Sequence, residues 1–164
     1  MSERSAALAT AFEQANDAVI AALEGSSEDQ ARAICDGEEW SVAVTAHHLA
    51  TGHQALAGFV QMMADGQELP PITMEMIHDG NAQHAAAFAG IGRDESLAAL
   101  RTHGAAAAAT VRGLSDEQLA RSAVMSFAGG ATRSVTDLIE RVLIGHALEH
   151  GKSIQSTVNQ PAAS

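Results

Sequence analysis

The sequence has few cysteines, prolines and aromatic residues. Cys35 is the only cysteine among 164 residues, so no disulfide can form within the chain and a structural zinc site built from several thiolates is excluded. Only three residues are Pro, which permits long uninterrupted helices. Aromatic residues make up 3% of the chain against 46% for all hydrophobic residues. This composition predicts a core of small aliphatic side chains, typical of closely packed helices.

Basic residues are also scarce, and their scarcity excludes some partners. Nine Lys and Arg residues stand against twenty Asp and Glu, for a net charge of −11. The sequence has no stretch of Lys and Arg that could neutralise a row of phosphates, so binding to nucleic acid and to an anionic membrane surface are both disfavoured. The N-terminal segment carries Glu3 and Arg4 without a long apolar run, unlike a signal peptide. We find no apolar window of about eighteen residues, as a membrane span requires, and expect a cytoplasmic protein.

The spacing of apolar residues predicts an all-α fold. Helices are expected over about 3–24, 41–65, 73–89, 94–111 and 134–158, with short helical segments within 26–40 and 115–122. Ser41 and Asp94 are expected to cap two of the long helices, and Ser134 with Asp137 resembles a capping box. Gly80 is expected to interrupt the third helix, and a loop is expected at Gly129. We predict a four-helix bundle with short extra helices in one domain, 1–158, followed by a disordered tail, 159–164.

Two of the eight histidines lie four residues apart in the last predicted helix. At this spacing the rings of His146 and His150 share one face, where they can bind one metal ion. Val142, one turn earlier, and Ile154, one turn later, place both rings in line with an apolar stripe. Two exposed histidines can have this spacing by chance, but the stripe favours metal, because buried polar rings need partners.

A third ligand is expected from a facing helix, because two histidines rarely complete a site. The second long helix offers His47, His48 and His53. Successive helical residues point about 100° apart, so His47 and His48 cannot both reach one ion, and periodicity alone leaves the choice between them open. We assign His53, His78 and His103 to solvated faces.

The third predicted helix carries two further polar candidates. Asn81, His84 and Phe88 fall on one face of that helix. Asn81 and His84 are therefore candidates to line a pocket near the metal. No side chain is identified as a general base or another catalytic group.

The start of the second helix resembles a known family. Trp40 and Ser41 are followed by apolar residues and then, eight residues after the Trp, by His48 and a Leu. This pattern is similar to the second-helix signature of the DinB superfamily, a group of metal-binding four-helix proteins described as metal-dependent hydrolases. The resemblance covers nearly the whole chain and singles out His48 over His47. It implies a bundle with a long crossover connection between the middle helices, and frequently a homodimer.

The last helix carries the second point of resemblance. His146, His150 and Ile154 match the family's His-x-x-x-His signature near the end of its last long helix. The mycothiol-dependent maleylpyruvate isomerases belong to the same superfamily, and the chain resembles them in its Trp-Ser segment. Those isomerases typically have Glu where this chain has His146, a departure that favours the three-histidine type of site. The resemblance implies a metal held by His48, His146 and His150.

Three neutral imidazoles leave open positions on a divalent ion, as in a catalytic or substrate-binding site. An all-nitrogen set suits zinc or nickel rather than magnesium or calcium. The open position can activate a water for hydrolysis or bind a low-molecular-weight thiol. We therefore expect a metal-dependent thiol S-transferase or hydrolase that acts on a small molecule. The alternative is a non-catalytic stress or small-ligand-binding protein whose metal is structural or adventitious.

Overall fold

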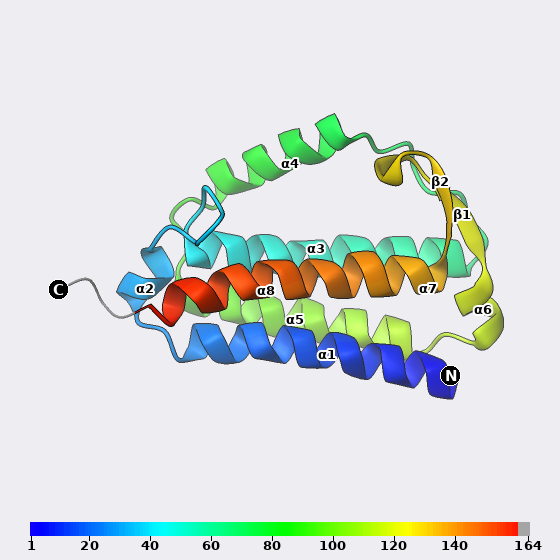
Figure 1. Ribbon diagram of the computed structural model, residues 1–164, viewed down its shortest axis with the longest axis horizontal. Coiled ribbons are helices and arrows are strands. Elements are labelled where there is room, and N and C mark those ends of the chain that lie inside the picture. The colour runs from blue at the N-terminus through cyan, green and yellow to red at the C-terminus, as the bar shows by residue number, and fades with distance from the viewer. Residues whose placement is uncertain (161–164) are drawn as a thin grey trace.

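In the computed structural model, which describes residues 1–160, four long helices pack into a bundle (Figure 1). They are α1 (Glu3–Glu24), α3 (Val42–Ala64), α5 (Arg93–Arg112) and a C-terminal helix made of α7 (Val135–Asp137), the π-helical segment η2 (Leu138–Ile144) and α8 (Gly145–Val158). The connections contain α2 (Glu28–Arg32), α4 (Met74–Ala87), α6 (Asp116–Ala120), β1 (Ser122–Met125), the 3-10 turn η1 (Ser126–Ala128) and β2 (Ala131–Ser134). The predicted class, a four-helix bundle with short extra helices, is confirmed.

Helix α4 is the long crossover between the two middle helices of the bundle. It carries the chain back along the molecule, so α3 and α5 pack together and run in the same direction (Figure 1). Helix α1 packs against α5 and α8, and α8 also packs against α3. None of the residues of α4 itself is buried. Figure 1 shows it as an arch that stands off the bundle.

Two of the predicted helix caps are confirmed. The Ser41 hydroxyl accepts a hydrogen bond from the backbone N–H of Val44 at 3.2 Å, and Ser134 forms a capping box with Asp137. The cap predicted at Asp94 is wrong, because α5 begins two residues earlier with Gly92 as its N-cap. The Asp94 carboxylate lies in the first turn instead, where it interacts favourably with the helix dipole.

The structure departs from the predicted elements at two further places. Helix α4 continues through Gly80 without the expected interruption. The stretch expected to be irregular contains an antiparallel hairpin, in which Ser122 pairs with Ser134 and Met125 with Ala131. Its turn includes a Gly pair at 129–130 with φ of 70° and 73°, a conformation that favours Gly. Of the predicted tail, residues 161–164 lie outside the described part of the chain.

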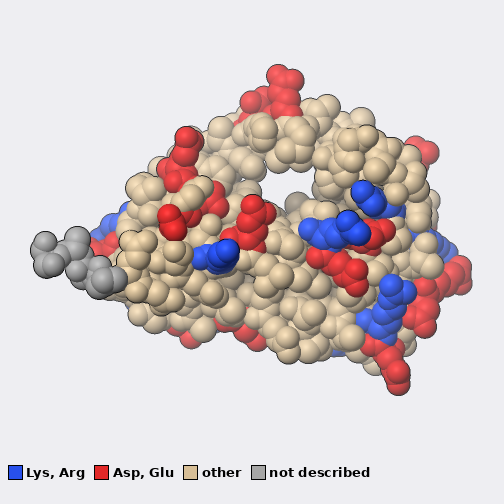
Figure 2. Space-filling view, in the orientation of Figure 1, with Lys and Arg blue, Asp and Glu red and all other residues tan. Residues whose placement is uncertain are grey.

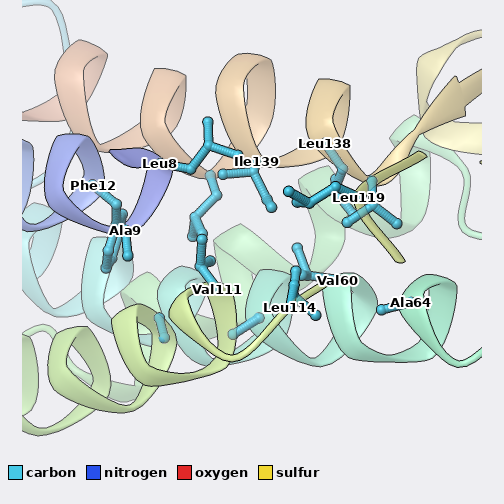
Figure 3. Packing of buried hydrophobic residues seen from close by; sticks show 14 of the residues in the cluster. Leu8, Ala9, Phe12, Val60, Ala64, Val111, Leu114, Leu119, Leu138 and Ile139 are labelled. Carbon is cyan, nitrogen blue, oxygen red and sulfur yellow. The ribbon is translucent and has the colours of Figure 1, made fainter. Parts of the chain in front are cut away.

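The buried side chains form two clusters along the bundle. One contains Leu8, Phe12 and Val60 together with residues of α5, α6 and the C-terminal helix, and Figure 3 shows these side chains interdigitating between the helices. The other lies nearer the opposite end and includes Val19, Leu49 and Ile154. Many members are Ala, which lets the helices approach closely, as the low aromatic content predicts.

Over residues 1–160, no helix combines the length and the apolar character that crossing a membrane requires.

Candidate metal centre

Three histidines, from two helices that are far apart in sequence but packed together, lie close to one another beside the crossover helix. Each of His48, His146 and His150 offers a ring nitrogen, and the three nitrogens lie within 4.8 Å of one another. His48 comes from the first half of α3, and the other two lie one turn apart on α8. Nε2 of His48 lies 3.2 Å from Nε2 of His146. The structure therefore brings together the three residues that the sequence singled out.

The Trp-Ser segment determines where His48 lies. Ser41 caps α3 and so fixes the residue at which the helix begins. The Trp40 ring packs edge-on against the His48 ring, with the ring centres 5.2 Å apart. The two residues thus set both the position and the orientation of a ligand two turns further along.

A close approach between helices holds the His146 ring. A Cβ atom at Gly52 would lie 2.7 Å from Cε1 and 3.1 Å from Nδ1 of His146, so the ring rests directly on the α3 backbone. Nδ1 is buried and has no hydrogen-bond partner among the described residues. With Nδ1 against the backbone, Nε2 is the nitrogen that points to the other rings. Sequence reasoning missed Gly52, because a helical Gly is not by itself a signal.

Glu38 orients the third ring. Nδ1 of His150 donates a hydrogen bond to Oε1 of Glu38 at 2.7 Å, and the two side chains are only 14% and 18% exposed. This contact leaves Nε2 of His150 free for a metal, in the way that carboxylates commonly orient metal-binding histidines. The sequence did not identify Glu38, although its Asp-Gly neighbours signalled a turn.

The turn that carries Glu38 is tied to the bundle. Gly37 has a φ of 75°, which lets the chain reverse direction before Glu38. The backbone N–H of Asp36 donates to the Thr157 hydroxyl at 2.6 Å, and the Ser156 hydroxyl donates to the Asp36 carboxylate at 2.8 Å. These bonds to α8 fix the turn over the last turns of the helix that bears His150.

Burial keeps two of the three rings neutral. Burial, with a smaller contribution from the neighbouring His150, lowers the pKa of His48 to about 4. It lowers the pKa of His146 to about 3, again with a contribution from His150. Near neutral pH both rings therefore have a free lone pair, the form that binds a metal ion.

The two candidate pocket residues of α4 have different surroundings. Asn81 lines the cavity next to the three histidines. His84 does not line it: its Nε2 lies 2.8 Å from Nδ1 of His47, and its ring meets that of His48 at a centre distance of 5.7 Å. The His47–His84 pair therefore connects α3 to α4 beside the cluster.

The assignment of His53 to a solvated face is wrong, because its side chain is fully buried. Its Nε2 donates to Oδ1 of Asn16 at 2.9 Å, and Nδ2 of Asn16 donates to the carbonyl of Leu100 at 3.2 Å. Burial lowers the pKa of His53 to about 3. Spacing from Leu49 and Ala57, each four residues away, could have indicated this core position.

A cavity of about 410 Å³ opens beside the three histidines. Its wall includes residues of α3, α4 and the C-terminal helix, together with Trp40 and Phe127. Figure 2 shows an opening between the α4 arch and the bundle. A small molecule bound there would lie against the three ring nitrogens.

Several solved structures resemble this fold. YfiT from Bacillus subtilis, described as a probable metal-dependent hydrolase with an unusual four-helix bundle topology, is 16% identical with a TM-score of 0.76, over 96% of this chain and 87% of its own. The mycothiol-dependent maleylpyruvate isomerase is 14% identical with a TM-score of 0.73, over 90% of this chain and 59% of its own. An uncharacterized protein from Clostridium difficile 630 is 12% identical with a TM-score of 0.72, over 95% of this chain and 96% of its own.

Among proteins with curated functions, none matches the sequence significantly. The sequence pattern of the DinB superfamily matches residues 11–154, a range that contains all four bundle helices in whole or large part and all three clustered histidines. The chain belongs to the DinB superfamily.

Proposed function

We propose that this protein is a metal-dependent thiol S-transferase that acts on a small molecule, with zinc or nickel held by His48, His146 and His150. The observation that carries the proposal is the convergence of three ring nitrogens within 4.8 Å on the wall of a cavity of about 410 Å³. A cytoplasmic location and a homodimer, both expected from the sequence and its family resemblance, belong to the same proposal.

The donor set fits a divalent transition metal. Two nitrogens bound to one tetrahedral zinc ion at about 2.1 Å lie roughly 3.4 Å apart, close to the 3.2 Å between Nε2 of His48 and Nε2 of His146. Both rings are neutral near pH 7 because burial lowers their pKa values. Imidazole nitrogen suits zinc and nickel, whereas magnesium and calcium prefer oxygen.

Three protein ligands leave room for a substrate. Structural zinc sites are usually closed by four protein ligands, whereas sites with three keep an open position. Here the three histidines line the cavity, so a metal held by them would be accessible to a molecule bound there. When bound, a divalent ion would lower the pKa of a thiol or a water in that position.

The scarcity of carboxylates in the cavity wall favours thiol transfer over hydrolysis. Among the described residues that line the cavity, Glu38 is the only carboxylate, and it already accepts a hydrogen bond from His150. A thiol, with an ordinary pKa of about 8.5, needs only a small shift to ionise and release its proton to solvent, whereas water, with a pKa of about 15.7, is a far weaker acid whose attack is helped by a general base. In the transfer, the sulfur bonds to an electrophilic carbon, and the leaving group departs with the electron pair of the broken bond.

Two structural neighbours support the choice of these chemistries. One is described as mycothiol-dependent, which agrees with a low-molecular-weight thiol as cosubstrate. The other is described as a probable metal-dependent hydrolase, and hydrolysis of a small molecule is therefore the second candidate.

Metal analysis of protein without an affinity tag tests the proposal. We expect about one zinc or nickel ion per chain, and we expect H48A, H146A and H150A to lose it while circular dichroism remains helical. Each should weaken binding by more than the roughly 10- to 100-fold that loss of an orienting partner causes. H78A, at an exposed position of α4, is the matched control and should bind normally. Unchanged stoichiometry in the three ligand variants would contradict the proposal.

Assays for conjugation of small thiols to electrophiles, made on the metal-loaded protein, distinguish the two chemistries. Thiol-dependent turnover that is lost in H150A and kept in H78A is the expected result. Turnover without any thiol would favour the hydrolase instead. A protein that binds metal yet does neither would be the non-catalytic binder.

A further inference from the structure

The cavity beside the histidines is long and apolar. Along α3 its wall runs from His48 to Phe59, and these residues are eleven helical steps apart, which corresponds to about 16 Å at 1.5 Å per step. Beyond the histidines the wall is mostly hydrocarbon and aromatic. The side chains that form this part are Leu56, Phe59, Ile72, Ile77, Phe127 and Val142.

The same wall has no positive side chain. Among the described residues that line the cavity, none is Lys or Arg, and the one charged residue is Glu38. Figure 2 shows basic side chains on the outer surface beside the opening, but these are not part of the wall. A carboxylate or phosphate placed away from the histidines would therefore lose part of its hydration without gaining a positive partner, which is unfavourable.

We infer that the substrate carries an elongated, uncharged apolar group, which binds along α3 between Leu56, Phe127 and Val142 while the reactive end lies at the histidines. The position of the reactive end rests on the proposed function, but the binding of the apolar group does not. The Asn81 amide is the polar group that α4 adds to this wall.

Trp40 provides a direct readout of occupancy. It is the only Trp in the chain, and it lines the cavity. We therefore propose titrating the metal-free protein with 1-butanol, 1-hexanol and 1-octanol, and separately with octanoate, while following Trp fluorescence and the heat of binding. Affinity should rise about fourfold per methylene, as burial of apolar chain predicts. Octanoate should bind about tenfold or more weakly than 1-octanol, because its charge finds no partner.

Variants in the wall test where the chain binds. V142K places a cation in the wall and should weaken 1-octanol while strengthening octanoate. L148K, on the same helix at a position that is 59% exposed and outside the cavity, is the matched control and should change neither. A55L, at an exposed position of the wall, narrows the cavity without adding charge, so it should weaken 1-octanol more than 1-butanol and provides a second test if V142K does not fold.

The results separate this inference from the proposed function. Octanoate that binds as tightly as 1-octanol, affinity independent of chain length, or no binding of any alcohol would overturn the inference. Zinc titration of the same preparations shows independently whether the histidines bind metal. Alcohol binding without zinc binding supports the apolar cavity and contradicts the metal site, and zinc binding without alcohol binding does the reverse.

Discussion

At the scale of single residues, Glu38 orients the ring of His150, one of the three proposed metal ligands, although Glu38 is not itself one of the three. Its bond to Nδ1 of His150 is 2.7 Å long. We expect E38A to weaken zinc affinity by about 10- to 100-fold, because the ring loses the partner that fixes its orientation. E39A, the exposed neighbour, should bind normally. Isothermal titration of both variants measures the difference, and equal affinities would remove Glu38 from the site.

The buried His53 gives a second prediction at this scale, which concerns how the free energy of unfolding depends on pH. In the unfolded chain this ring becomes protonated as the pH falls below its ordinary pKa of 6.5, whereas in the folded protein its pKa is about 3. Between these values the unfolded state binds more protons, so acidification lowers the free energy of unfolding, by about 1.4 kcal/mol per pH unit from this group.

The variant H53Q isolates this contribution. Its amide can still donate to Asn16 but does not titrate. Urea unfolding of the metal-free protein at pH 6 and pH 5 should therefore show a smaller loss of stability for H53Q, by about 1.2 kcal/mol, because the unfolded ring is already partly protonated at pH 6. Equal losses in both proteins would assign the acid sensitivity to other groups.

These residues differ in how far the sequence could predict them. His146 and His150 share a helix, so their spacing alone places them together. His48 needed the Trp-Ser pattern, because periodicity did not separate it from His47. Glu38 meets His150 across 112 residues of chain, and such a contact depends on a loop path that no periodicity specifies.

At the scale of elements, α3 contains a pair of glycines with different surroundings. A Cβ at Gly52 would collide with the His146 ring, whereas a Cβ at Gly58 would meet nothing within 4 Å. We expect G58A to raise the free energy of unfolding by up to about 1 kcal/mol, the helix preference of Ala over Gly.

G52A should lower the free energy of unfolding despite the same preference, and should weaken zinc binding by about tenfold or more, because the ring must move. Urea unfolding and zinc titration of both variants provide the comparison. If G52A binds zinc as G58A does, the close packing of the ring on α3 is not required.

The elements also show where periodicity fails. Apolar spacing predicted the long helices to within a few residues, because each buries a continuous stripe. It missed the β1–β2 hairpin, whose strands have only four residues each and bury little, so no alternation emerges. It also missed the π-helical winding of Leu138–Ile144, since a segment of 7 residues is too short to show a period distinct from that of an α-helix.

At the scale of the whole molecule, the proposed ion would join α3 to α8. His48 and His146 are 98 residues apart in sequence, so a bound metal would link two segments that are far apart along the chain. Zinc at about 100 times its dissociation constant should stabilise the protein by about 2.7 kcal/mol, which raises Tm by roughly 5–10 °C for a chain of this size.

Thermal unfolding with zinc and with a chelator measures this effect. The shift should disappear in H146A. A Tm that does not respond to chelator in metal-loaded wild-type protein would mean that the ion does not stabilise the native bundle.

The α4 arch contributes Ile77 and Asn81 to the cavity wall but places no residue in the core. Mutations there can reshape the pocket while the bundle and its histidines stay as they are. Descendants of one ancestral gene could therefore acquire new substrates through changes in a single exposed helix, with little risk of misfolding.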